Sequence, residues 1–360
     1  MPRALPDALP ELSADELGWL ATLDDVESRL VFTEEKDGTT TYRVEHGPFD
    51  EQQLTSLPDK NWTLLVQDVE KHLPVFRNVL LEVSFASDWR IDDLMVSFAA
   101  PGGSVGPHRD NYDVFLCQAD GVREWRIAAV DAKLKDIESG GLSLLEPFAD
   151  DNRVKACGGD VLYLPPGIAH WGIAREAAMT YSIGMRAPTL AEFIAGVSRV
   201  LDIEIDNDRS EERFYEDPDL STIEAKPGLI SDCALERARN CFSSDIDDAD
   251  FATVFGSVVT DVKAWLAPEE PASSEIDEIL ARPTANVSAH GMARLAYCTV
   301  ADQNLVFVNG HARTVTADQL NRFRRLCTDR ITIADDNGLF RWLLAHGAID
   351  LETDEQSDAT

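Results

Sequence analysis

The stretch GPHRDNYDVFLCQADGVREWRI, which runs from Gly106 to Ile127, decides the fold of this chain. It alternates apolar and polar side chains at strand length, and we predict that His108 and Asp110 lie on a β-strand within it. Residues i and i+2 of a strand point to the same face, so the imidazole of His108 and the carboxylate of Asp110 converge on one point. Two metal-type ligands that face one pocket require a third.

Short strand-like segments surround this stretch. Ser13 and Glu16 form a capping box for an opening helix, and the chain then becomes strand-rich with Gly and Pro turns. We predict strands at residues 29–35, 40–46, 93–103, 112–118, 124–130, 159–167 and 180–188. Such a series of short strands is typical of an antiparallel barrel or sandwich.

The pattern of apolar and polar residues changes twice after the strand-rich region. Residues 196–265 are predominantly helical, and a linker at 267–279 leads into a last unit. In that unit we predict a hairpin at 305–315, followed by helices at 316–327 and 339–349. We therefore predict an α+β protein with three parts: a β-barrel at 1–195, a helical region at 196–265 and a C-terminal domain at 266–360. The apolar faces of the helices predict a homodimer.

The amino-acid composition limits the classes of molecule that this chain can bind. The formal charge of −33 disfavours direct binding to DNA or RNA, because nucleic-acid binders need local Lys and Arg, and it favours a basic polypeptide. Adaptation of the surface to salt explains the same charge equally well. No segment reads as a signal peptide or a membrane span, and the six cysteines are scattered without a Cys-x-x-Cys pair. These features predict a cytoplasmic protein with no membrane partner.

The third metal ligand is sought in GDVLYLPPGIAHWG. A tight Pro-Pro-Gly turn precedes His170, which begins the next predicted strand. Two histidines and one carboxylate on a β scaffold form the facial triad that holds Fe(II) and leaves positions open for a cosubstrate and O2. We therefore predict a metal site of His108, Asp110 and His170. The other histidines lack such neighbours and are predicted to be surface or packing residues: His46, His72, His290, His311 and His346.

Arg123 acquires a role if the metal is iron. When 2-oxoglutarate binds iron through its keto-acid end, its far carboxylate needs a cation, and a guanidinium can meet that carboxylate with two hydrogen bonds. A hydroxyl nearby completes the grip, and Ser97, on the strand before His108, can supply it; Ser182 is the weaker candidate. No catalytic residue beyond the metal ligands is predicted.

The motifs resemble those of a known family. The run DWRIDDLMVSFAAPGGSVGPHRDNYDVFLCQADGVREWRI, followed by GGDVLYLPPGIAHWG and TYSIGMRAP, resembles the JmjC-type bacterial ribosomal oxygenases. These are 2-oxoglutarate-dependent arginine hydroxylases of large-subunit ribosomal protein sixteen. The resemblance covers nearly the whole chain. It implies a double-stranded β-helix (a JmjC/cupin-like barrel), a helical dimerisation region and a C-terminal winged-helix-like domain.

The same resemblance implies the ligands and the reaction. It places Fe(II) on His108, Asp110 and His170, 2-oxoglutarate on Ser97 and Arg123, and 3-hydroxylation on an arginine of a basic ribosomal protein. The basic residues of the C-terminal domain are confined mostly to RFRR in an acidic setting, so we expect that domain to contact protein or to be structural, not to read DNA.

Other classes of function stay open at this point. A relative of the same superfamily could hydroxylate histidine or demethylate lysine. A metal cupin without oxygenase chemistry is another alternative, although cupins commonly carry His-x-His where this chain has Asp110. A DNA-binding regulator is the third, and the charge disfavours it. If a basic substrate is attracted, we expect carboxylates such as those of Asp88, Asp92, Asp93 and Asp113 to surround the mouth of the barrel.

Overall fold

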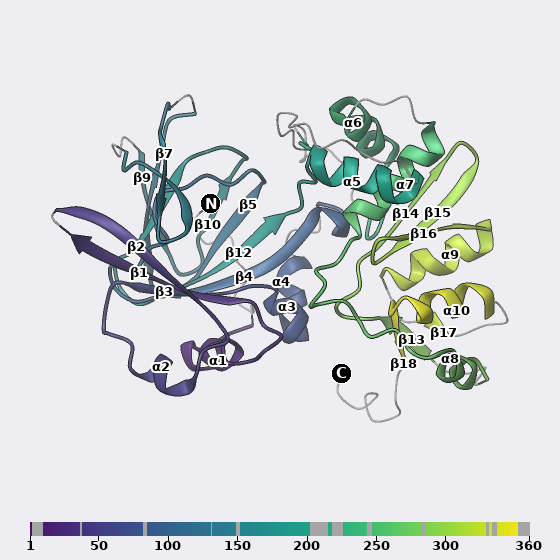
Figure 1. Ribbon diagram of the computed structural model, residues 1–360, viewed down its shortest axis with the longest axis horizontal. Helices are drawn as coiled ribbons and strands as arrows, with labels where there is room; N and C mark the ends of the chain where they lie inside the picture. The colour runs from purple at the N-terminus through teal and green to yellow at the C-terminus, as the bar shows by residue number, and fades with distance from the viewer. Residues whose placement is uncertain are drawn as a thin grey trace. The chain divides into compact units, whose positions relative to one another are not determined.

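The computed structural model of the chain divides into two compact units (Figure 1). The first comprises Met1–Glu82 and Ile91–Met185, and the second comprises Val83–Arg90 and Arg186–Thr360. The structure describes residues 1, 10–36, 38–81, 85–130, 132–148, 152–201, 215–217, 226–242, 247–281, 286–328, 331–332 and 337–351. Every residue of the predicted metal and cosubstrate sites belongs to the first unit.

Antiparallel strands make up most of the first unit. They are β1 (Ser28–Lys36), β2 (Thr39–His46), β3 (Trp62–Val66), β4 (Ile91–Ala99), β5 (Val114–Asp120), β6 (Val122–Ile127), β7 (Asp136–Ser139), β8 (Leu142–Leu145), β9 (Asn152–Cys157), β10 (Val161–Leu164), β11 (His170–Ala174) and β12 (Ala178–Met185). One sheet has the order β10-β5-β12-β4-β3-β1-β2, a second has the order β11-β6-β9, and β7 pairs with β8. Each strand predicted from the sequence overlaps one of these, so the predicted β-rich core is confirmed.

Strand β12 is an interior strand of the larger sheet. It pairs with β4 on one side and β5 on the other, and all eight of its residues are buried. Ser182 stands opposite Met95 of β4 and Leu116 of β5. Because directly opposed residues of antiparallel strands point to the same face, this register places the three side chains in one row across the sheet.

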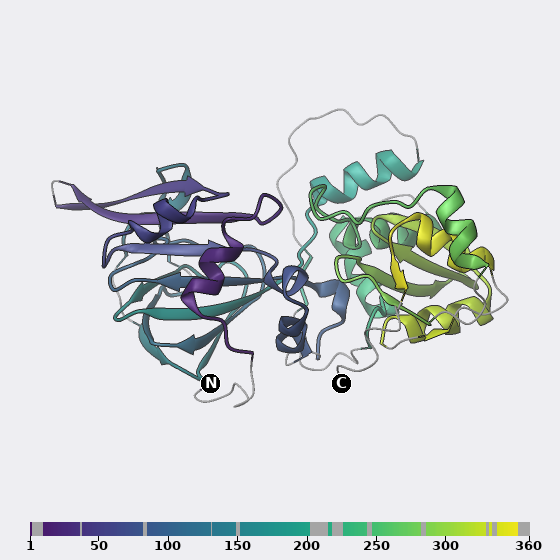
Figure 2. The ribbon, with the colours of Figure 1, turned by 90° about the horizontal axis from the view of Figure 1, so that it is seen from below.

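Short helices complete the first unit. They are α1 (Ala14–Leu20), α2 (Glu51–Thr55), α3 (Val69–His72), the 3-10 helix η1 (Pro74–Phe76) and α4 (Arg77–Leu81). Helix α1 packs on the larger sheet at β3 and β4 and buries Leu17 and Leu20 fully (Figure 2). The predicted capping box starts it: Glu16 N donates to Ser13 Oγ at 3.2 Å, and Ser13 N donates to the Glu16 carboxylate at 2.8 Å.

The second unit combines helices with two small sheets. Its elements are η2 (Asp88–Arg90), α5 (Leu190–Leu201), α6 (Asp232–Phe242), α7 (Asp248–Val259), α8 (Ser273–Leu280), β13 (Asn286–Ala289), β14 (Leu295–Val300), β15 (Gln303–Val308), β16 (His311–Val315), α9 (Ala317–Leu326), β17 (Ile331–Thr332), α10 (Asn337–Ala345) and β18 (Ile349–Leu351). The sheets have the orders β14-β15-β16 and β17-β13-β18. One apolar core includes Phe193, Phe251 and Phe255, and another includes Phe323 and Phe340.

The predicted elements of the second unit are largely confirmed. The hairpin at 305–315 is β15 and β16, and the helices at 316–327 and 339–349 are α9 and α10. Helix α7 ends at Val259, so the last residues of the predicted helical region, 260–265, are not helical. Thr260 caps the end: its hydroxyl donates to Gly256 O at 2.8 Å and accepts from Gly310 N at 3.2 Å. Within the predicted helical region, residues 202–214, 218–225 and 243–246 lie outside the described residues.

Within the described part of the chain, none of the helices combines the length and the apolar character that crossing a membrane requires.

A matched pair of glycine substitutions tests the packing of the first unit. Gly121 and Gly141 both have positive φ, at 68° and 83°, so alanine strains the backbone at either position. A Cβ at Gly121 would lie 2.0 Å from the carbonyl oxygen of Ala177, whereas a Cβ at Gly141 meets nothing within 4 Å. We expect Gly121→Ala to lower the free energy of unfolding by about 1–3 kcal/mol more than Gly141→Ala, measured by thermal melting. Equal losses would contradict the close approach.

Candidate functional site

A pocket of about 280 Å³ lies in the first unit and is lined by residues of both of its larger sheets. Strand alternation decides which side chains reach it. On β4, Asp93, Met95 and Ser97 line the pocket, whereas the intervening Leu94 and Val96 do not. The predicted residues Ser97, His108, Asp110, Arg123, His170 and Ser182 all line this one pocket.

His108 and Asp110 do not lie on a strand, which corrects the prediction from their i, i+2 spacing. They lie in the connection between β4 and β5, where Gly106 has a φ of 89° and Pro107 follows it. His108 forms a single antiparallel bridge with His170: each backbone N–H donates to the other residue's carbonyl, at 3.0 and 2.8 Å. The two imidazoles are therefore neighbours because their backbones pair.

The structure brings the three predicted metal ligands together. The donor atoms of His108, Asp110 and His170 all lie within 4.8 Å of one another. The Nε2 atom of His108 is 4.0 Å from one carboxylate oxygen of Asp110, and the Nε2 atom of His170 is 3.6 Å from the other. Two imidazole nitrogens and a carboxylate around one point are the donor set that suits a divalent iron ion.

The Nδ1 nitrogen of each imidazole ring is already hydrogen-bonded to the backbone. Nδ1 of His108 lies 2.9 Å from Gly106 O, and Nδ1 of His170 lies 3.0 Å from Ile168 O. A carbonyl can only accept, so both Nδ1 atoms donate, which leaves each Nε2 with a lone pair directed at Asp110. Burial, and next the neighbouring His108, lower the pKa of His170 to about 4, so its ring is neutral at pH 7. These residues fit a divalent metal.

Arg123 is a buried cation that faces the same pocket. It lies on β6 and is 6% exposed; within the described part of the chain its Nε and Nη2 atoms have no hydrogen-bond partner. Burial lowers the pKa of its guanidinium to about 10, which leaves it charged at pH 7. A buried guanidinium with unsatisfied donors is costly, and an anionic ligand in the pocket would satisfy it. The residue thus fits a carboxylate.

Two serine hydroxyls border the pocket. Ser97 of β4 is 2% exposed and Ser182 of β12 is 5% exposed. Ser97 pairs with Thr180 and Ser182 pairs with Met95, so the two serines are diagonal neighbours on adjacent strands and point to the same face. Both can donate a hydrogen bond to a ligand that Arg123 holds.

One of the four carboxylates expected around the mouth of the barrel lines the pocket itself. Asp93 lines the pocket, but Asp92 and Asp113 do not, and Asp88 belongs to the second unit. Asp113 is buried and accepts a hydrogen bond of 2.6 Å from the Tyr163 hydroxyl. The alternation of β4 turns Asp92 away from the pocket lining, and the hydrogen bond with Tyr163 holds the Asp113 side chain.

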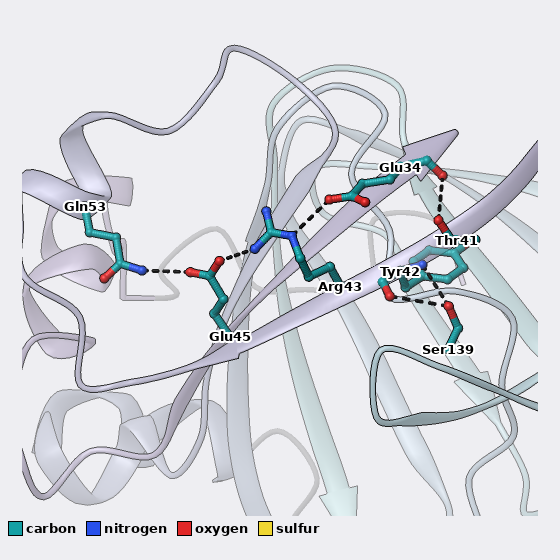
Figure 3. Close-up of polar contacts among 7 residues, drawn as sticks. All are labelled: Glu34, Thr41, Tyr42, Arg43, Glu45, Gln53 and Ser139. Carbon is teal, nitrogen blue, oxygen red and sulfur yellow. Dashed lines mark hydrogen bonds and ion pairs between the residues drawn. The ribbon is translucent and has the colours of Figure 1, made fainter. Parts of the chain in front are cut away.

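The hairpin of β7 and β8 forms part of the pocket wall, and the sequence analysis missed it. Leu142 and Leu144 line the pocket, and Leu144 packs with Val31 and Tyr42 of the β1–β2 hairpin. Figure 3 shows the attachment: Tyr42 N donates to Ser139 Oγ at 3.0 Å, and Ser139 Oγ donates to Tyr42 O at 3.3 Å. The Gly140–Gly141 dipeptide between the two strands is a two-residue hairpin signal that could have identified this element from the sequence.

The same close-up shows how the outer strands are braced. Arg43 of β2 donates to Glu34 of β1 at 2.9 Å and pairs with Glu45, which accepts from Gln53 at 2.7 Å (Figure 3). This chain of charged groups lies on the exposed side of the hairpin. Exposed pairs contribute little stability individually, so their main effect is to hold the hairpin in register beside the pocket.

Comparison with known proteins identifies close relatives. Residues 78–193 match the family described as JmjC domain. The ribosomal protein uL16 3-hydroxylase of Escherichia coli is 36% identical over 273 residues, which are 75% of this chain and 70% of that protein. A probable ribosomal oxygenase of Haemophilus influenzae is 29% identical over 304 residues, 81% of this chain and 74% of that protein. The structure of the Escherichia coli ribosomal oxygenase YcfD in complex with cobalt and 2-oxoglutarate has a TM-score of 0.68 and 30% identity, and covers 98% of this chain and 94% of that chain.

Replacing Arg123 tests whether the pocket is built for an anion. Arg123→Met removes a buried charge and keeps a long apolar stem, so we expect the free energy of unfolding without ligand to rise by about 1–3 kcal/mol. The same change should abolish the rise in melting temperature that added 2-oxoglutarate produces in the parent protein.

Arg126→Met is the matched control, because Arg126 lies on the same strand and faces Glu124 at 3.7 Å. It should leave the response to 2-oxoglutarate in place. A destabilised Arg123→Met protein that still responds to 2-oxoglutarate would rule out the anion site.

Proposed function

Because the chain belongs to the JmjC-type ribosomal oxygenases, we propose that it is an Fe(II)- and 2-oxoglutarate-dependent dioxygenase that 3-hydroxylates an arginine of a large-subunit ribosomal protein. One observation carries the proposal: the cluster of His108, Asp110 and His170 shares a pocket with the buried guanidinium of Arg123. A metal site alone would suit many proteins, whereas a metal site paired with an unsatisfied buried cation suits a metal-bound dicarboxylate.

The residues of the pocket would bind the metal and the cosubstrate separately. His108, Asp110 and His170 would hold Fe(II), and Arg123 would orient the far carboxylate of 2-oxoglutarate, with a hydrogen bond from Ser97 or Ser182. When bound, iron and 2-oxoglutarate supply the oxidising chemistry: one oxygen atom of O2 enters a substrate C–H bond and the other enters succinate, which forms together with carbon dioxide.

Part of the pocket wall is apolar. Val114, Leu116 and Trp125 line it and are each less than 9% exposed. These apolar side chains lower the local dielectric constant, which strengthens the ion pair that Arg123 can form.

A cationic side chain suits the part of the pocket beside Asp93. This carboxylate lines the pocket while it is only 8% exposed, and Tyr112, 39% exposed, lies in the same wall. A partly desolvated carboxylate next to an aromatic ring favours a guanidinium, which can bond the carboxylate and stack on the ring. The proposed partner is therefore a basic ribosomal protein, in line with the −33 charge of the chain.

The larger organisation is also proposed. We keep the division into a barrel at 1–195, a helical dimerisation region at 196–265 and a winged-helix-like domain at 266–360. The exposed Trp265, at 57%, supports a pairing surface in the helical region, and α8, α9, α10 and the β15–β16 hairpin support a winged-helix-like arrangement. The acidic charge supports a C-terminal domain that contacts protein, not DNA, and a cytoplasmic location beside ribosomal substrates.

Asp110→Ala tests the reaction. Loss of the carboxylate of the metal site should lower hydroxylation at least about 100-fold, because even indirect partners of a metal contribute 10- to 100-fold. The measurement is mass spectrometry of a basic large-subunit ribosomal protein, in which a gain of one oxygen on arginine is expected. Asn111→Ala, an exposed neighbour in the same loop, is the control and should retain activity.

Other reaction products would change the assigned substrate or activity. A gain of oxygen on histidine, or a loss of methyl from lysine, would indicate another target within the superfamily. If the parent protein does not turn over 2-oxoglutarate, the remaining assignment is a metal-binding cupin without oxygenase activity.

Salt dependence separates electrostatic attraction of the substrate from adaptation of the surface. The screening length falls from about 10 Å at 0.1 M salt to about 3 Å at 1 M, so attraction of a basic peptide should weaken over this range. We expect kcat/KM for an arginine-containing ribosomal peptide to fall at least about tenfold, and less steeply in Asp93→Asn. Turnover of 2-oxoglutarate without peptide gives the baseline, and a flat or rising kcat/KM would leave the charge as a salt adaptation.

A further inference from the structure

A second group of metal-type donors lies in the second unit. Glu270, His311 and His346 each present a donor atom, and these atoms all lie within 4.8 Å of one another. The prediction that His311 and His346 lack such neighbours is therefore wrong. The proposed oxygenase chemistry uses none of these residues.

The three donors come from three separate segments. Glu270 lies in the connection before α8, His311 is the first residue of β16, and His346 directly follows α10. No sequence motif spans these segments, so only the tertiary structure brings the donors together.

Close packing and a hydrogen bond fix the three segments to one another. A Cβ at Gly347, which has a φ of 60°, would lie 2.5 Å from Pro268, so the connection that carries Glu270 packs directly against the end of α10. Asn309 Nδ2 donates to His346 O at 2.8 Å, which attaches the β15–β16 turn to the same helix end. The donors therefore lie on a preformed scaffold.

The distances and burial point to a shared ion. Nδ1 of His346 lies 3.9 Å from Glu270 Oε1, beyond hydrogen-bonding distance, and within the described residues this buried atom has no hydrogen-bond partner. Donors that share an ion at about 2.0–2.2 Å lie a little over 3 Å apart, so a small movement of the exposed Glu270 closes the gap.

The imidazole rings of His311 and His346 must change their relative orientation before both can bind one ion. They stack with centroids 4.0 Å apart and planes at 17°. Because an imidazole binds a metal in its own plane, one ring must turn for both to share an ion. His311 is exposed and can turn, whereas His346 packs edge-on against Trp342 at 5.1 Å.

We propose that Glu270, His311 and His346 form a second metal site, which takes a divalent first-row transition-metal ion of the Zn²⁺ class and fastens three segments of the second unit together. Two imidazoles and one carboxylate are a donor set for such ions, whereas Ca²⁺ and Mg²⁺ require mostly oxygen donors. The carbonyl end of α10 beside His346 adds a favourable partial negative charge.

Zinc binding to a chain that lacks the pocket ligands tests the proposal. In full-length protein that carries His108→Ala and Asp110→Ala, we expect one equivalent of Zn²⁺ to bind by isothermal titration calorimetry and to raise the melting temperature. Adding His311→Ala, a change at an exposed position, should weaken binding at least about tenfold and remove the thermal shift, and Glu270→Gln should weaken binding as well.

His290→Ala in the same background is the matched control. His290 also lies in the second unit and faces a carboxylate, that of Asp350 at 3.8 Å, but it belongs to neither three-donor group found among the described residues. It should leave zinc binding unchanged. Absence of zinc binding in the background protein, equal losses in His290→Ala and His311→Ala, or equal binding of Mg²⁺ would each overturn the second site.

Discussion

The reciprocal pair of backbone hydrogen bonds between His108 and His170 is the contact on which the pocket depends. It joins the β4–β5 connection to the first residue of β11, which belongs to the smaller of the two main sheets. Neighbouring backbone bonds hold the same connection: Gly167 N donates to Asp110 O at 2.7 Å, and Leu145 N donates to Pro107 O at 2.8 Å. Because these bonds involve only the main chain, the backbone positions of His108, Asp110 and His170 depend little on the side chains around them.

The pocket carries a cost that its ligand can offset. Arg123 is buried with unsatisfied donors, and a chain selected for stability alone would place an apolar side chain there. The same burial makes the guanidinium effective, because a buried charge attracts a carboxylate far more strongly than a charge in water does. Stability of the unliganded protein and affinity for an anion are thus opposed at this position, as is common at functional sites.

The two histidine clusters differ in how their donors are encoded. In the first, His108 and Asp110 are two residues apart, and His170 follows a distinctive Pro-Pro-Gly turn, so local sequence points to each member. In the second, Glu270, His311 and His346 stand in unrelated surroundings, and the packing of Gly347 on Pro268 unites them. A histidine that looks isolated in sequence can therefore belong to a donor cluster.

The sequence by itself determined the features that depend on short-range physics. The Ser13–Glu16 capping box, the period-two strands and the turn at Asn309–Gly310 follow from local hydrogen bonds and backbone preferences, and the candidate ligands followed from residue chemistry and resemblance. Only the tertiary structure decided that Asp93 faces the pocket while Asp113 bonds Tyr163, that His108 and Asp110 lie in a loop, and that a β7–β8 hairpin forms a wall. The reason is register: neighbouring residues of a strand face opposite ways, and pairing with distant strands determines which face meets the pocket.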